Sequence, residues 1–323
     1  MNYFKILYMM ILMYMSFLGW SSNNWLIMWF IMEIMFLFFV GVTSLNLGYN
    51  SVELIMKYYI VQIFFSIILL GVMIFSMFNM LLLMNMLMFF LMLFKLGLFP
   101  FHFWLIMIVG KMGWLSFYLM SSLLKIMPIL MIYYMLEILN YNMLILVSVV
   151  IGSMMGINNT LIQKLMSYSS MIHLCWLLVA LNFSIIFFEY YFCSYLYMLA
   201  TVCYLFNLVN VYYINQSTIL MGSLFYKFMI FFLVLSLAGF PPFMGFISKW
   251  IIMYLMILLN LKFLFFFMLF FSVFSIYFYL QLFFYIMMIF GLSLKWYKFN
   301  YSMSFLFLMM SPILFFYIML YFI

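Results

Sequence analysis

Residues 81–104 read LLLMNMLMFFLMLFKLGLFPFHFW, and this stretch decides the class of the protein. Apolar residues fill about three to four helical turns before a single cation, Lys95. The helix breakers Gly97 and Pro100 follow, and then His102. A lysine at the centre of a membrane helix costs about 2.5–3.5 kcal/mol, and proline removes a backbone donor. Freed backbone groups are tolerated in a bilayer only where protein or a wet cavity covers them. The stretch therefore predicts a discontinuous membrane helix whose lysine faces a hydrated interior.

A second stretch near the other end of the chain has the same parts in another order. Residues 235–250 read LSLAGFPPFMGFISKW. Gly239, Pro241 and Pro242 form the break, and Lys249 follows about two helical turns after Pro241. We therefore expect a second discontinuous helix with a second buried lysine.

Composition excludes a soluble protein. Of the 323 residues 73% are hydrophobic and 5% are charged, with a mean hydropathy of +1.38, whereas soluble domains carry about 25% charged residues. The sequence predicts an all-α polytopic membrane protein with a single transmembrane domain, residues 1–323. The net charge of +7 comes from dispersed lysines, so we expect no nucleic-acid partner.

About 20 apolar residues are needed to cross a bilayer, and on that rule we expect about eleven spans. The fourth and the ninth contain the two breaks, and residues 43–57, 158–164 and 215–223 are expected as polar connections. The predicted spans are residues 4–19, 25–42, 58–78, 80–109, 114–135, 144–157, 165–181, 185–214, 228–258, 263–290 and 305–321.

Lysine distribution predicts the orientation of these spans. In membrane proteins the loops on the cytoplasmic or inner side carry an excess of lysine and arginine. With the N-terminus inside, only Lys262 lies on the outer side, and Lys95, Lys125 and Lys249 lie within spans. The lysines on the inner side are Lys5, Lys57, Lys111, Lys164, Lys227, Lys295 and Lys298.

Four charged residues fall within predicted spans: Glu33, Lys95, Lys125 and Lys249. Each alone is open to a reading in which the side chain reaches an interface. Together they indicate a proton or cation relay, because lysine can release its proton when buried whereas arginine keeps it. Glu33 and Lys95 are expected to form a pair, and Lys249 to exchange protons with water at the second break and to act as the exit gate. The alternative for Lys249 is an interfacial side chain beside Trp250.

Two histidines are further candidates. His102 and His173 each fit either a hydrogen-bonded packing residue or a proton carrier. Ser169 and His173 share one helix face, and that face could hold water. Gly152 and Gly156 form a small-xxx-small pair, which favours close helix packing.

The sequence contains no pattern typical of a cofactor or metal site. It lacks a GxGxxG fingerprint, a Walker motif and CxxC, and Cys175, Cys193 and Cys203 lie in apolar runs without metal-site spacing. We therefore expect this chain to bind no cofactor and no metal by itself.

Six strings resemble a known family, and they occur in that family's order. They are FIMEIMFLF (30–38), VELIMKYYIVQ (52–62), GLFPFHFW (97–104), LLKIMP (123–128), NNTLIQKLMSYSSMIHLCW (158–176) and AGFPPFMGFISKW (238–250). They resemble the subunit 2 family of mitochondrial NADH:ubiquinone oxidoreductase, complex I. One departure is that Gly110 and Lys111 stand where many members carry Glu-Gly.

This resemblance implies an antiporter-like fold of two inverted five-helix repeats, each with a discontinuous helix. It implies a proton-translocating subunit of the mitochondrial inner membrane, with its N-terminus on the matrix side. The proton-path residues would be Glu33, Lys95, Lys125 and Lys249. The energy would come from electron transfer elsewhere in the complex, where NADH, FMN, Fe-S clusters and ubiquinone are expected. Expected partners are neighbouring antiporter-like and small membrane subunits, the lipid bilayer, protons and internal water.

Two alternatives remain open from the sequence. One is a cation/proton antiporter of the same fold, which usually needs a carboxylate-rich site. The other is a purely structural membrane subunit, which would have no use for four buried charged groups.

Overall fold

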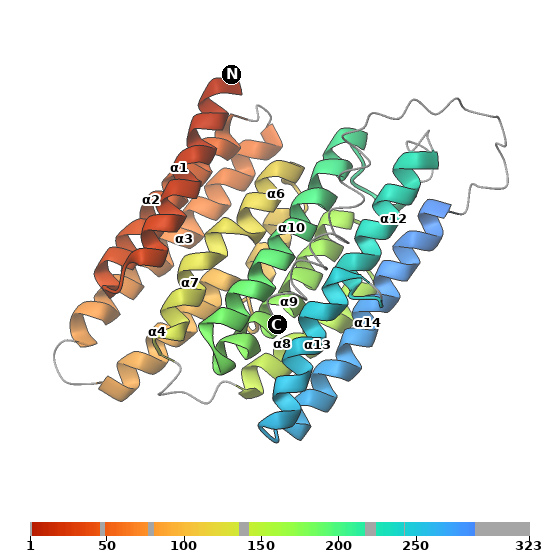
Figure 1. Ribbon diagram of the computed structural model, residues 1–323. Helices are drawn as coiled ribbons and strands as arrows, with labels where there is room; N and C mark the ends of the chain where they lie inside the picture. Colours follow the sequence, from red (N-terminus) through yellow and green to blue (C-terminus); the bar gives the residue numbers. More distant parts are fainter. Residues whose placement is uncertain are drawn as a thin grey trace. The chain divides into compact units, whose positions relative to one another are not determined.

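The computed structural model describes residues 2–45, 49–76, 81–135, 142–216, 224–241 and 243–287 (Figure 1). These residues form long helices joined by short turns, with an isolated β-bridge between Leu161 and Tyr213. Seven helices in the described ranges are long and apolar enough to cross a membrane, and several shorter apolar helices accompany them. The chain divides into two compact units, residues 1–151 and 152–323. The prediction of a single domain stays a prediction.

The first unit is built around α7. This helix packs against α1, α2, α4 and α6, so its side chains are buried along most of its length. By contrast, α1 exposes large apolar side chains such as Tyr3 and Phe17. The helices of this unit are α1 (Asn2–Ser21), α2 (Trp25–Ser44), α3 (Tyr49–Ser76), α4 (Leu81–Leu96), α5 (Phe103–Val109), α6 (Trp114–Ser121) and α7 (Leu123–Tyr133).

In the second unit α9 occupies the corresponding central place. Its residues from Leu165 to Leu181 are buried, and α10, α13 and α14 pack against it. Figure 1 shows α10, α12 and α14 beside one another in green to blue. The helices are α9 (Ile162–Phe183), α10 (Ile185–Val209), α12 (Leu224–Ala238), α13 (Met244–Leu258) and α14 (Lys262–Met287), and α8 (Asn142–Ile157) runs across the boundary at residue 151.

Close packing explains the two glycines of α8. A Cβ atom on Gly152 would lie 3.2 Å from the side chain of Ile172, and one on Gly156 would lie 3.0 Å from Phe278. Both contacts are tighter than ordinary van der Waals packing. The interpretation of this pair as a helix-packing feature is therefore confirmed.

The first ten predicted spans each coincide with one helix or with two consecutive helices of the described residues. The eleventh, residues 305–321, and the predicted breaker Pro242 lie outside the described residues. One prediction was wrong: residues 43–57 are largely helical, because α2 continues to Ser44 and α3 begins at Tyr49. Part of the reason is a salt bridge of 2.5 Å between Glu53 and Lys57, one helical turn apart, which supports this end of α3.

Two further boundaries differ from the predicted spans. Helix α10 ends at Val209, because Asn210 adopts the left-handed conformation (φ 55°) and stops the helix before residue 214. The span predicted as residues 114–135 is interrupted at Ser122, where φ is −116° and ψ is −85°. Helices α6 and α7 are therefore separate, and the polar pattern of the sequence gave no sign of this break.

The two predicted breaks are real and have the same backbone hydrogen bonds. At the end of α4, Gly97 takes φ 69°, and its N–H donates to Phe94 while the N–H of Leu98 donates to Leu93. This pattern is the Schellman motif, which needs a residue with positive φ, and glycine adopts that conformation without steric cost.

At the end of α12, Gly239 takes φ 81° and repeats the motif. Its N–H donates to Ser236, and the N–H of Phe240 donates to Leu235, each at 3.2 Å. The two discontinuous helices, α4–α5 and α12–α13, are thus terminated by the same device, one in each unit.

Candidate functional site

A partly buried ion pair joins α2 to the broken helix of the first unit. Lys95 Nζ lies 3.2 Å from Glu33 Oε1, although the two residues are 62 positions apart in sequence. Their side chains are 6% and 21% exposed, respectively. Because Lys95 is in the last turn of α4, its charge also lies at the negative end of that helix dipole. The structure thus brings together the two residues expected to pair.

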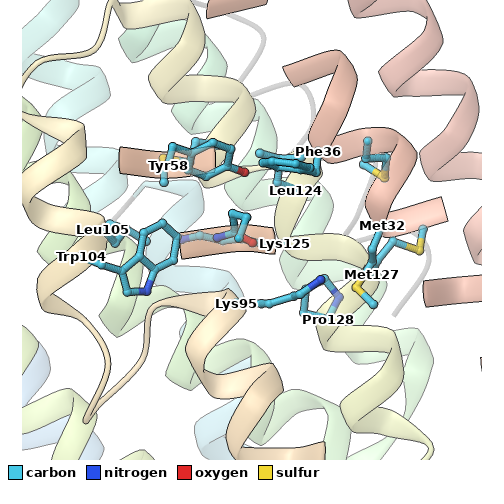
Figure 2. Close-up of a pocket in the computed structure, with 13 residues that line it drawn as sticks. Met32, Phe36, Tyr58, Lys95, Trp104, Leu105, Leu124, Lys125, Met127 and Pro128 are labelled. Atoms are coloured by element: carbon cyan, nitrogen blue, oxygen red, sulfur yellow. The ribbon is translucent and has the colours of Figure 1, made fainter. Parts of the chain in front are cut away.

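A small cavity adjoins this ion pair. The volume open to the centres of water molecules is ≈ 40 Å³. Because one water needs about 10–15 Å³ on this measure, the cavity has room for a few waters. Its polar lining comes from Lys95, Lys125, Tyr58 and Gln62, and the remaining lining side chains are Met, Phe, Leu, Pro and Trp. Figure 2 shows both lysines among these side chains, with Tyr58 and Trp104 beside them. The cavity therefore connects two of the sequence-predicted relay residues.

Lys125 lies on α7, three residues before Pro128, and is only 3% exposed. The interfacial alternative does not describe this side chain, because it is buried and lines the cavity. In a helix the N–H of residue 128 would donate to the carbonyl of Leu124, but Pro128 has no N–H. Both residues also line the cavity. A polar backbone group is thus made available close to the lysine.

Tyr58 and Gln62 were missed as candidates. They are one turn apart on α3 and 4% and 8% exposed, so their polar ends face the same interior. Both belong to the string VELIMKYYIVQ, and the spacing of Tyr58 and Gln62 on one face of an apolar helix was the available signal.

In the second unit Lys249 lies on α13 and reaches back to the end of α12. Its ammonium group donates to the carbonyl of Ala238 at 2.9 Å, and the side chain is 3% exposed, whereas Trp250 is 57% exposed. The interfacial alternative therefore fails for Lys249. The lysine bonds directly to one of the carbonyls that this break leaves without a helical partner.

A helix end leaves its last four carbonyls without intrahelical partners. At the described end of α12, the Schellman bonds satisfy the carbonyls of Leu235 and Ser236. Lys249 satisfies Ala238, and Nε2 of His173 lies 3.2 Å from the carbonyl of Leu237. All four carbonyls of this end are thereby satisfied, and two of them by side chains that can carry a proton.

His173 is 3% exposed and its other ring nitrogen, Nδ1, lies 2.8 Å from the hydroxyl of Tyr191 on α10. On the helix face that His173 shares with Ser169, Tyr279 of α14 donates to the Ser169 hydroxyl at 2.6 Å. The idea that this face holds water stays a prediction.

His102 lies in the break between α4 and α5 and is 2% exposed. Its ring packs on Phe103, with ring centroids 4.1 Å apart, and it is not among the residues that line the cavity. The structure thus gives His102 a packing contact and does not bring it to Lys95 and Lys125 at the cavity wall.

Exposed charges form a separate cluster at one end of the first unit. Glu53 on α3 accepts from Lys57 and, at 2.7 Å, from Lys111 in the turn after α5. The side chains are 43–59% exposed. Here α3 supplies the carboxylate for this surface.

Taken together, the helices, breaks and buried charges define a class: an integral membrane protein of the transporter type, with ionisable groups at two discontinuous helices. Residues 22–275 match the family model described as NADH:quinone oxidoreductase/Mrp antiporter, TM. The chain belongs to this family.

The matches to individual proteins agree with it. NADH-ubiquinone oxidoreductase chain 2 of Locusta migratoria is 30% identical over 262 residues, which are 78% of this chain and 76% of that one. The chain 2 protein of Anopheles gambiae is 36% identical over 242 residues, 72% of this chain and 71% of that one. The resemblance to the subunit 2 family of complex I is therefore confirmed.

Solved structures share the fold. A chain of respiratory complex I from Thermus thermophilus with bound aureothin superposes with a TM-score of 0.70 at 20% identity, covering 82% of this chain and 66% of that chain. A chain of the Mrp complex from Dietzia sp. DQ12-45-1b gives a TM-score of 0.74 at 16% identity, covering 83% and 57%.

Proposed function

We propose that this chain is a proton-translocating subunit in the membrane arm of respiratory complex I. The observation that carries the proposal is the partly buried Glu33–Lys95 ion pair beside a water-sized cavity that Lys125 also lines. Buried ionisable groups in a membrane interior are costly, and they mark ion or proton paths. Family membership gives the arrangement its context.

The relay works through the switching of one charge by another. While Glu33 holds Lys95, both groups are stabilised in their charged forms. When a charge elsewhere in the complex draws the carboxylate away, the buried ammonium loses its counter-ion and releases its proton to cavity water. Lys125, on the same cavity, accepts that proton. The return of Glu33 reloads Lys95.

Lys249 serves the relay within the second unit. Its ammonium group lies at the C-terminal end of α12, whose partial negative charge stabilises a cation. After Lys249 has released its proton, its neutral amine or a water molecule would donate to the Ala238 carbonyl. This makes Lys249 the exit group of the path, with His173 beside it on the neighbouring carbonyl.

The named relatives are chains of NADH-ubiquinone oxidoreductase, and they support the setting that we propose. The subunit lies in the mitochondrial inner membrane with about eleven spans arranged as inverted repeats in a single domain, and its N-terminus faces the matrix. Other membrane-arm subunits contact it. NADH-to-ubiquinone electron transfer elsewhere in the complex supplies the energy, and this chain carries no redox centre.

A cation/proton antiporter is the second candidate, and the likeness to a chain of the Mrp complex favours it. The two candidates differ in the transported ion. A proton subunit translocates with the same rate in sodium-free and sodium-containing media, whereas an antiporter requires the second cation.

The test of the proposal is Lys95→Met in the intact complex, reconstituted into sealed vesicles. NADH-driven acidification per assembled complex should fall at least about tenfold, because a neutral side chain cannot carry the proton. The matched control is Lys57→Met, which removes a lysine with a 59% exposed side chain. If Lys95→Met acidifies the vesicles at the wild-type rate, the proposal is wrong.

A further inference from the structure

His173 is held by two partners whose hydrogen-bonding roles differ. A backbone carbonyl can only accept a hydrogen bond, whereas a phenol hydroxyl can donate or accept. Nε2 of His173 faces the carbonyl of Leu237, and Nδ1 faces the hydroxyl of Tyr191. Nε2 must therefore carry a hydrogen in every protonation state in which the Leu237 bond exists. The atom at which His173 gains or loses a proton is Nδ1.

The Leu237 carbonyl has a structural reason to keep this bond. It is one of the four carbonyls at the end of α12, and residue 241, which would donate to it in a continued helix, is a proline without an N–H. An unsatisfied carbonyl in the bilayer interior is costly. The broken helix thus fixes the histidine tautomer, and it does so next to the carbonyl that binds Lys249.

Tyr191 can satisfy Nδ1 in both states of the histidine. When the imidazole is neutral, the Tyr191 hydroxyl donates to Nδ1. When the imidazole is protonated, Nδ1–H donates to the same hydroxyl oxygen, and only the hydroxyl hydrogen has to rotate. Because Tyr191 is 1% exposed and His173 is 3% exposed, water does not compete freely for this role.

We propose that His173 holds the relayed proton at Nδ1 and that Tyr191 is the positioning residue that keeps Nδ1 hydrogen-bonded in both protonation states. This rests on the proposed function, since it places a proton-holding site in the path. The relay proton binds to the Tyr191 oxygen while the hydroxyl hydrogen passes to Nδ1, and it leaves by the reverse exchange, so Tyr191 is a neutral phenol before and after each transfer. The negative end of the α12 dipole stabilises the imidazolium, as it stabilises Lys249.

The experiment compares variants of the intact complex in sealed vesicles. Tyr191→Phe removes the hydroxyl and keeps the ring. The matched control is Tyr195→Phe on the same helix, one turn further on, whose ring lies 5.0 Å from the His173 ring but whose hydroxyl is not the one bonded to Nδ1. Acidification per assembled complex and the solvent isotope effect on it are measured for each. The isotope effect reports proton transfer, which a purely structural change would leave unaltered.

Tyr191→Phe should lower acidification about tenfold per assembled complex and raise the solvent isotope effect, because Nδ1 loses a buried partner. Tyr195→Phe should behave as wild type. Wild-type acidification and an unchanged isotope effect in Tyr191→Phe overturn the inference, and so does an equal loss in both tyrosine variants.

His173→Gln covers the case in which Tyr191→Phe does not assemble. The glutamine amide can donate to the Leu237 carbonyl but holds no proton, so we expect acidification to fall at least as far as in Tyr191→Phe. Wild-type acidification in His173→Gln overturns the inference. Lys95→Met, measured beside these variants, distinguishes a failure of the proposed function from a failure of this inference. If Lys95→Met abolishes acidification while His173→Gln does not, the proposed function stands and the inference is wrong.

Discussion

Glu33→Gln is the change that most sharply probes the ion pair, because glutamine keeps the shape of the side chain and removes its charge. In the native chain the carboxylate lies 3.2 Å from Lys95 Nζ. At an effective dielectric constant of about 20, two unit charges at that separation attract each other by about 5 kcal/mol. Removal of one partner from a buried pair costs about 3–5 kcal/mol in practice.

The lower end of that range applies here. The Glu33 side chain is 21% exposed, so the pair is only partly buried. A loss of about 3 kcal/mol corresponds to about a hundredfold in an equilibrium constant. Since Lys95 has to be reloaded with a proton in every cycle, acidification per assembled complex should fall between about tenfold and a hundredfold.

The assay is NADH-driven acidification in sealed vesicles, with the amount of assembled complex measured on the same preparation. Glu53→Gln is the matched control, because it removes a carboxylate from two salt bridges at an exposed surface. Exposed pairs contribute little, so this variant should remain close to wild type. Refutation would come from a Glu33→Gln complex that acidifies as fast as the wild-type complex, or from equal losses in the two variants.

Three further predictions follow from the same contacts. Lys249→Met should assemble normally and lower acidification at least about tenfold, and a wild-type rate would reduce Lys249 to a packing residue. Gln62→Leu should lower acidification severalfold, because it removes a polar group from the cavity wall; stopped-flow measurement of vesicle pH tests this, and an unchanged rate argues against water in that cavity. Gly239→Ala should lower the thermal stability of the complex by about 1–2 kcal/mol, because residue 239 has φ 81° and a Cβ there would lie 2.9 Å from Lys249 Nζ; an unaltered melting temperature would contradict the strain.

The parts of this molecule that the sequence predicted are those with a local physical cause. Gly97 and Gly239 interrupt apolar helices wherever the rest of the chain lies, since positive φ favours glycine. The pairing of Glu33 with Lys95 was also predictable, because buried opposite charges need each other and few charges occur within the spans.

The parts that were missed depend on how helices pack. The interruption at Ser122 was not predicted. Gln62 reaches the cavity because α3 packs against α4, and α7 supplies further residues of the cavity wall. The hydrogen bond between His173 and Tyr191 likewise depends on the rotation of α10 about its axis. The hydrogen bond that Tyr279 donates to Ser169 depends in the same way on packing, because Tyr279 lies on a helix distant in sequence.

The most direct measurement is NADH-driven acidification by the intact complex carrying Lys125→Met, normalised to assembled complex. Lys125 and Lys95 line the same cavity. Lys125 is not part of the Glu33–Lys95 salt bridge, so its replacement removes neither partner of that bridge. If protons cross that cavity, acidification falls at least about tenfold although the ion pair is intact. Acidification at the wild-type rate would contradict a proton path through the cavity.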